Sequence, residues 1–158
     1  MMNIIIRKAT IDDLEQVNVL RRQVNDLHVN GRPDIFRAGF CDEMWDRLYQ
    51  VYDSKNYDVI VAVDGKTPVG YAVVEYAKKP LSPYNNERTY YKIEEIGVDK
   101  DRRDQGIGTL LMTFLKADAK ESGYQKIELD VWEFNKNAMR FYESQGFSCY
   151  RRYLEVEV

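Results

Sequence analysis

A glycine-containing turn before a strongly amphipathic segment is the clearest candidate for a chemical site. It has the sequence Arg102-Arg103-Asp104-Gln105-Gly106-Ile107-Gly108-Thr109. Gly106 and Gly108 permit a tight turn because they have no Cβ, and the helix that follows begins with amide N–H groups that lack intrahelical acceptors. These amides point outward at the positive end of the helix dipole, an arrangement that binds phosphate or pyrophosphate. Two adjacent arginines add positive charge, so the turn predicts a phosphate site.

The spacing of this turn excludes two common nucleotide-binding loops. A Walker A loop needs Gly-Lys-Ser/Thr, whereas Gly108 is followed by Thr-Leu-Leu. A dinucleotide fingerprint needs a small residue where this chain has Leu111, and it belongs to the first β-α unit of a parallel sheet. A turn that merely begins a helix is the alternative interpretation. The arginine pair and the strand predicted before the turn favour the phosphate site.

Two motifs resemble those of the GNAT N-acetyltransferase superfamily. The first, Arg103-x-x-Gly106-x-Gly108 after the strand Ile93–Val98, is similar to the family's acetyl-coenzyme A signature. The second is similar to the family's N-x-x-A-x-x-φ-Y-x-x-x-G-F pattern and comprises Asn135, Ala138, Phe141, Tyr142, Gly146 and Phe147. The predicted order of elements also matches along the whole chain. One departure is Lys100, which stands where many members have proline.

The resemblance implies an enzyme that moves the acetyl group of acetyl-coenzyme A to an amine by direct attack in a ternary complex. In the family, the strand before the turn splays from the strand Ile127–Val131, and the pantetheine arm lies in the gap. The residues that this implies for coenzyme binding are Ile96, Val98, Arg103, Asp104, Gln105, Gly106, Ile107, Gly108, Thr109, Asn135, Ala138 and Tyr142. Asn135 is also expected to cap the helix that follows it.

An acceptor ammonium must lose a proton before it attacks, and Glu94 and Glu95 are the candidate bases. Strand alternation predicts that only Glu94 shares the face of Ile96 and Val98. Relatives with a glutamate in this strand place it on that face. We therefore expect Glu94 to be the base, with Glu95 as the second candidate. The alternative is that either glutamate merely holds a nearby lysine or arginine.

At the other end of the reaction, a thiolate leaves poorly unless it is protonated or hydrogen-bonded. The resemblance assigns the general-acid role to Tyr142. The alternative is a core tyrosine at helical spacing with Ala138 and Phe141.

The segment Leu27–Phe36 resembles the acceptor-side loop of bacterial small-molecule acetyltransferases. We expect His28, Phe36, Glu95 and Asp130 to line the acceptor site, although a packed or capping role is the alternative for His28. Acidic side chains suit a cationic amine, which favours a small-molecule acceptor. Two alternatives stay open: acetylation of a protein or peptide N-terminus or lysine, and a non-catalytic acyl-coenzyme A binding module.

Composition removes several other classes of function. The chain has 23 Lys and Arg against 26 Asp and Glu, which argues against nucleic-acid binding through bulk positive charge. One histidine and two cysteines cannot form a standard zinc site or a disulfide framework, so no metal is expected. Apolar runs are far shorter than the ~20 residues of a membrane span, and a cytoplasmic protein is expected. Many relatives are dimers, so the resemblance allows a homodimer.

The 158 residues predict a single domain over positions 1–158. Alternation and apolar runs predict strands at Asn3–Lys8, Val59–Val63, Val69–Tyr76, Thr89–Val98, Ile127–Val131 and Phe147–Val158. Helical spacing predicts helices from Ile11 into the twenties, over Asp42–Asp53, from Ile107 to a stop at Gly123, and over Lys136–Gln145. Thr10, with Asp13 three residues on, is expected to cap the first of these helices, and Asp64-Gly65 predicts a hairpin turn between two strands. This order predicts an α/β fold whose mixed, mostly antiparallel sheet has one parallel pair and helices on both faces.

Overall fold

The computed structural model describes residues 2–158 and contains a five-stranded mixed sheet in the order β1-β2-β3-β4-β5. The strands are β1 (Ile4–Lys8), β2 (Tyr57–Asp64), β3 (Thr67–Lys79), β4 (Arg88–Val98) and β5 (Ile127–Leu129). The first four strands pair antiparallel, whereas β4 and β5 pair parallel across the α3 crossover. The predicted mixed sheet with one parallel pair is therefore confirmed.

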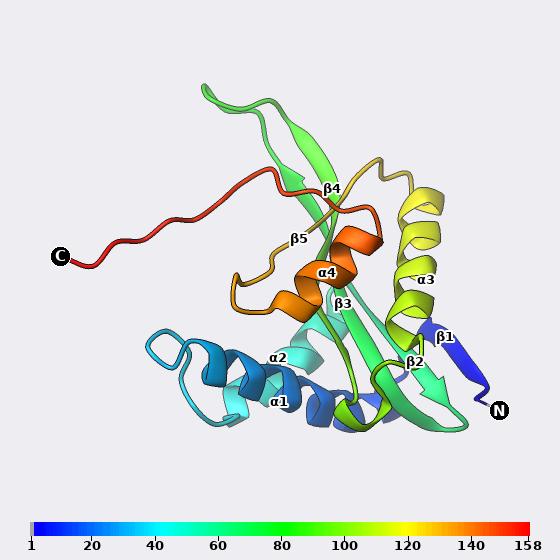
Figure 1. The fold of residues 1–158 in the computed structure, drawn as a ribbon. Helices are drawn as coiled ribbons and strands as arrows, with labels where there is room; N and C mark the ends of the chain where they lie inside the picture. Colours follow the sequence, from blue (N-terminus) through cyan, green and yellow to red (C-terminus); the bar gives the residue numbers. More distant parts are fainter. Residues whose placement is uncertain (1) are drawn as a thin grey trace.

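Helices cover both faces of the sheet (Figure 1). They are α1 (Leu14–Gly31), α2 (Asp42–Asp53), α3 (Ile107–Glu121) and α4 (Lys136–Ser144). On one face, α1 and α2 pack on Val59, Val61 and Val73. On the other face, α3 and α4 pack on side chains that include Ile60 and Val74. The central strands β2 and β3 carry long apolar runs because both of their faces are buried.

Local patterns account for the ends of several elements. The Thr10 N–H donates to Asp13 Oδ2 (2.7 Å), which forms the predicted cap before α1. The predicted hairpin turn at Asp64-Gly65 joins β2 to β3, and Gly65 has the positive φ that such a turn needs. Among residues 2–158, no helix combines the length and apolar character needed to cross a bilayer.

The predicted last strand, Phe147–Val158, is wrong for the single chain. These residues carry no regular secondary structure, and Figure 1 shows the segment running away from the body toward the C-terminus. Alternating side chains report only that one face of an extended segment is apolar. A strand also needs a neighbouring backbone to pair with, and this segment has none within the described chain.

Candidate active site

A bulge in β4 places Glu94 and Glu95 on the same face of the sheet. Val73 of β3 lies opposite Glu95 while Val74 lies opposite Ile93, so Glu94 is an extra residue without a partner. Both glutamates line a small cavity with side chains of α1, α2, β2 and β3, namely Arg21, Arg47, Leu48, Val51, Tyr57 and Val73.

The bulge also corrects the alternation argument for Glu94. Ile93 and Ile96 both pack in the core beneath α3, so the strand changes parity between them. Glu94 therefore does not share the face of Ile96 and Val98, because alternation holds only in a regular strand. What the bulge gives instead is a half-buried carboxylate at the edge of a cavity.

Glu95 is fully engaged by neighbouring side chains. Arg21 Nε donates to Glu95 Oε2 (2.9 Å), and Arg21 Nη2 donates to Oε1 (3.0 Å). The hydroxyl of the buried Tyr71 also donates to Oε2 (3.2 Å). Arg21 itself is buried and bonds Asn18 Oδ1 (2.8 Å) and the Met44 carbonyl (2.6 Å). The geometry thus matches the alternative interpretation of Glu95, in which it holds an arginine.

Glu94 has a different set of partners. Its Oε1 lies 3.1 Å from Lys92 Nζ. Burial acts to raise the pKa of Glu94, but hydrogen bonds with Glu75 and Lys92 outweigh it and hold the pKa below its usual value. The pKa of Glu75 is raised in turn, by burial and by the hydrogen bond with Glu94. Glu94 is therefore ionised at neutral pH and able to accept a proton.

Sequence reasoning missed Glu75 and Lys92 as neighbours of this carboxylate. The two residues lie opposite each other in the pairing of β3 with β4. No local pattern could have indicated them, because their proximity depends on the register of two strands.

The C-terminal part of β4 has an open edge. Pairing with β5 ends at Ile93 and Leu129, and Glu94–Val98 continue without a β5 partner. The β5 side of this stretch is therefore open, and an open strand edge can bond an extended ligand as it would an added strand. This separation matches the gap that the family resemblance implies.

The turn beside this edge leads directly into α3 through a glycine in the left-handed conformation. Gly106 caps α3 at φ 81°, and the first bond of the helix runs from Leu110 N–H to the Gly106 carbonyl (3.1 Å). Amides earlier in the turn therefore have no acceptor within the helix. Arg102 Nη2 bonds Asp64 (2.7 Å) at the hairpin, whereas Arg103 Nε reaches the Val98 carbonyl at the open edge (3.5 Å).

Helix α4 packs against the start of α3. A Cβ at Gly108 would lie 3.3 Å from the Phe141 ring, so only glycine allows this approach without displacement. Asn135 Oδ1 accepts from the Ala138 N–H (3.2 Å), which confirms the predicted cap. Tyr142 packs in the same cluster as Ile96 and Val98. Burial raises the pKa of Tyr142 to about 12, so its hydroxyl stays protonated and can donate.

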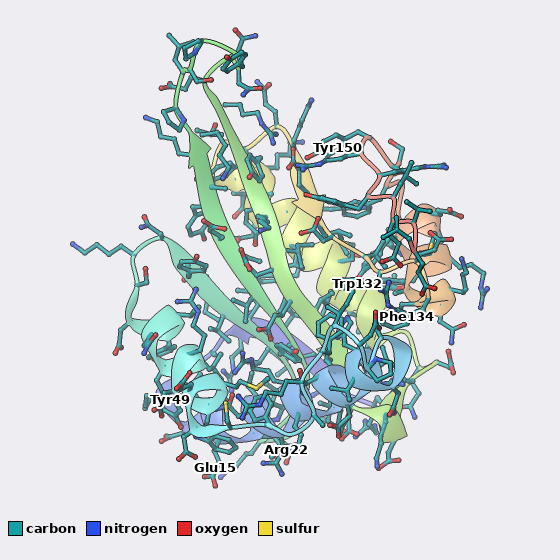
Figure 2. All side chains as sticks on the ribbon, turned by 90° about the vertical axis from the view of Figure 1, so that its left-hand side faces the viewer. Glu15, Arg22, Tyr49, Trp132, Phe134 and Tyr150 are labelled. Atoms are coloured by element: carbon teal, nitrogen blue, oxygen red, sulfur yellow. The ribbon has the colours of Figure 1, made fainter. Side chains whose placement is uncertain are left out.

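A cluster of aromatic side chains packs at the C-terminal end of α1. His28 lies 5.1 Å from Phe36 and 5.9 Å from Phe134 between ring centroids, and Phe36 lies 4.9 Å from Trp132. Gly31 leaves no room for a Cβ beneath Phe134. Figure 2 shows Trp132 and Phe134 above this end of the helix. The structure thus joins the predicted His28 and Phe36 with two aromatic side chains that had no predicted role.

Asp130 is exposed just after β5. Its charge helps to raise the pKa of Lys92, behind the larger effect of Glu94 and against that of burial. Asp130 therefore belongs with the charged groups around Glu94 rather than with the aromatic cluster. Within residues 2–158, no three His, Cys, Asp or Glu side chains gather in a way that could hold a metal ion.

Comparison with known proteins agrees with this geometry. The family model described as Acetyltransferase (GNAT) family matches residues 26–147. A solved structure of a tetramutant of the BH1408 protein from Bacillus halodurans is 34% identical, covers 98% of this chain and 99% of that chain, and has a TM-score of 0.90. The aminoglycoside N-acetyltransferase AAC(6')-Iy, solved in complex with CoA, shares the fold at 16% identity over 100% of this chain and 96% of that chain, with a TM-score of 0.77.

A curated relative is the uncharacterized N-acetyltransferase MJ1207 of Methanocaldococcus jannaschii. It is 30% identical over 147 residues, which is 90% of this chain but 59% of the relative. The chain spans between half and two thirds of the length of the curated relatives it matches.

Proposed function

This chain belongs to the acetyltransferase (GNAT) family, and we propose that it transfers the acetyl group of acetyl-coenzyme A to a primary amine of a small molecule. One observation carries the proposal: side chains of the open edge of β4, the first residue of α3 and the ring of Tyr142 pack together on one face of the sheet. Ile96, Val98 and Tyr142 are members of the same cluster as the first residue of α3. The proposed catalytic unit is a single domain over residues 1–158.

The turn and the open edge suit two parts of the coenzyme, its pyrophosphate and its pantetheine arm. Amides of residues 104–109, with Arg103, are placed to bind the pyrophosphate at the start of α3. Backbone groups of Ile96 and Val98 are placed to bind the pantetheine arm, whose amides alternate donor and acceptor as a strand does. Asn135 and Ala138 form the start of α4 on the same side. A CoA complex of an aminoglycoside N-acetyltransferase with this fold supports the assignment.

Glu94 is proposed as the base. An alkyl ammonium has a pKa of about 10.4, so exposing its lone pair at neutral pH costs roughly 4–5 kcal/mol. An ionised Glu94 takes that proton directly or through one water, the amine nitrogen then bonds to the acetyl carbon, and the second proton that the nitrogen loses as the amide forms passes to solvent. Glu95 is less suited to this role because both of its oxygens already accept hydrogen bonds.

Tyr142 is proposed to assist the leaving sulfur. As the carbon–sulfur bond breaks, the protonated hydroxyl donates to the developing thiolate, and solvent restores the phenol proton. The raised pKa keeps the donor in place at all physiological pH values. The products are the acetylated amine and free coenzyme A.

The charged groups around Glu94 favour a cationic small molecule as acceptor. Glu75, Glu94 and Asp130 place three carboxyl groups near Lys92. The relatives and structures that resemble this chain include enzymes named for aminoglycoside and streptothricin acetylation, which also supports a small amine. Acetylation of a peptide amine and binding without turnover are the competing functions.

A thiol-release assay tests the proposal and separates its competitors. Purified protein with acetyl-coenzyme A is offered a panel of polyamines, amino sugars and peptides with free N-termini or lysines, while calorimetry measures coenzyme affinity. We expect saturable coenzyme binding and amine-dependent thiol release with a small amine. Release with peptides alone would support the peptide function. Binding without release from any amine would support a binding module, and absence of binding would overturn the proposal.

A further inference from the structure

The ammonium group of Lys92 lies against the carboxylate that we propose as the base. Lys92 Nζ is 3.1 Å from Glu94 Oε1. The Lys92 side chain is 29% exposed, whereas that of Lys78, which also forms an ion pair on this hairpin, is 66% exposed. Lys92 is therefore a partly buried amine, held at the position that an acceptor amine must also reach under the proposed function.

The open edge of β4 indicates where the reacting end of the coenzyme lies under the proposed function, on which this inference rests. The edge runs from Glu94 to Val98, between the last pairing with β5 and the glycine turn before α3. A strand of this length covers roughly 16 Å, which is comparable with the length of an extended pantetheine arm. With the pyrophosphate at the turn, the arm therefore brings its thioester to the closed end of the gap, beside Glu94.

Lys92 reaches this closed end from the paired part of the strand. Its backbone lies opposite Glu128 of β5, and the pairing ends one residue later, where Ile93 lies opposite Leu129. Because Lys92 Nζ contacts Glu94, the lysine side chain extends along β4 toward the open edge rather than away from it. The amine is therefore next to the place expected for the thioester.

The charges around Lys92 make its reactivity depend on Glu94. Glu75 lies opposite Lys92 in the pairing of β3 with β4, and Asp130 adds its charge from just after β5. Burial acts to lower the pKa of Lys92, but the hydrogen bond and the charge of Glu94 outweigh it and raise the pKa. Lys92 is thus an ammonium group at neutral pH, and it becomes nucleophilic only when a base takes its proton. Glu94 is the carboxylate in contact with it.

We propose that Lys92 is a self-acetylation site, at which the chain takes the acetyl group of its own coenzyme when no acceptor amine is bound. Glu94 accepts one proton from the ammonium group, and the freed Nζ bonds to the acetyl carbon. The second proton that the nitrogen loses passes to solvent. As the carbon–sulfur bond breaks, the sulfur takes a proton from Tyr142, whose hydroxyl is restored from solvent. The products are acetylated Lys92, which is neutral and no longer pairs with Glu94, and free coenzyme A.

Mass spectrometry on the purified full chain tests the proposal. The protein is incubated with saturating acetyl-coenzyme A and no amine, and acetylation of each lysine is followed over time. We expect Lys92 to be acetylated about tenfold or more faster than Lys126, which is exposed before β5. The rate per chain should stay the same when the protein is diluted, because the reacting groups belong to one chain. Lys92→Arg keeps the positive charge and should remove the modification.

A second variant separates self-acetylation from chemical acetylation by the free thioester. Glu94→Gln should slow acetylation of Lys92 by about tenfold or more and leave that of Lys126 unchanged. Equal rates at the two lysines, an unchanged rate at Lys92 in Glu94→Gln, or a rate per chain that falls on dilution would overturn the inference. Thiol release with an added amine while Lys92 stays unmodified would also overturn it, and would leave the proposed function intact. Absence of coenzyme binding would overturn both.

Discussion

Arg21 of α1 and Glu95 of β4 form a bidentate ion pair, with nitrogen–oxygen distances of 2.9 and 3.0 Å. The pair joins residues 74 positions apart and ties α1 to the strand residue next to Glu94. Arg21 also binds the Met44 carbonyl of α2, so one side chain fixes both α1 and α2 to the bulge. The position of the proposed base therefore depends on a buried arginine far from it in sequence.

Removal of this arginine should destabilise the protein strongly. Arg21→Ala leaves Glu95 and the Met44 carbonyl without their cationic donor, and breaking a buried pair on one side costs about 3–5 kcal/mol. Urea unfolding followed by circular dichroism measures the change. The control is Arg22→Ala, an exposed neighbour on the same helix, which should change the free energy of unfolding by about 0.5 kcal/mol or less. Equal stability of the two variants would contradict the structural role of Arg21.

Glu94→Gln should lower turnover by about 10²-fold, because the acceptor amine loses its proton acceptor. The loss should be largest at low pH, where the amine is protonated, and smaller as pH approaches the pKa of the amine. A profile of kcat/KM against pH in the thiol-release assay measures this. An effect of the same size at every pH would indicate that another group or a water chain carries the proton.

Lys92→Met should move the acidic limb of the wild-type pH profile to higher pH. Lys92 is one of the groups that hold the pKa of Glu94 down, so its removal raises that pKa. The base then becomes protonated, and inactive, at a higher pH than in the wild type. Lys126→Met is a suitable control, because Lys126 is exposed before β5 and does not pair with Glu94. An acidic limb that does not move would contradict the assignment of Glu94 as base.

Tyr142→Phe should reduce kcat by about 10²-fold or more, with little change in coenzyme affinity. The variant keeps the ring that packs between Phe141 and Phe147 and removes only the donor. Calorimetry with coenzyme A and steady-state kinetics separate the two effects. The exposed Tyr84 provides the control as Tyr84→Phe, and unchanged turnover in Tyr142→Phe would remove this hydroxyl from catalysis.

Gly106→Glu should abolish coenzyme binding, because it places a carboxylate beside the amides proposed to bind the pyrophosphate. Gly106 has φ 81°, so a non-glycine residue there also costs about 1–2 kcal/mol of stability. Gly123→Glu is a control with matched strain, since Gly123 has φ 84° at the opposite end of α3. Calorimetry should detect binding by the Gly123 variant only. Normal affinity in Gly106→Glu would refute the phosphate assignment.

Local patterns in the sequence were sufficient for most of the fold. The Thr10 cap, the Asp64-Gly65 turn and the helical spacing of α3 each depend on residues a few positions apart, and each is confirmed. The glycine turn and the Asn135 cap could be predicted for the same reason, because each is formed by residues close together in the sequence. The conformation of Phe147–Val158 could not be predicted in this way. Alternating side chains do not tell whether a neighbouring backbone is available for the segment to pair with.

The arrangement around the proposed base was decided only by the tertiary structure. Whether Glu94 and Glu95 share a face depends on the bulge, and the bulge exists only in the pairing of β4 with β3. The Arg21–Glu95 pair and the contact of Phe134 with Gly31 likewise join distant segments. The sequence by itself therefore determined which chemical groups are available and which local elements carry them. Strand register and helix packing decided which groups meet, since both arise from contacts between residues far apart in the chain.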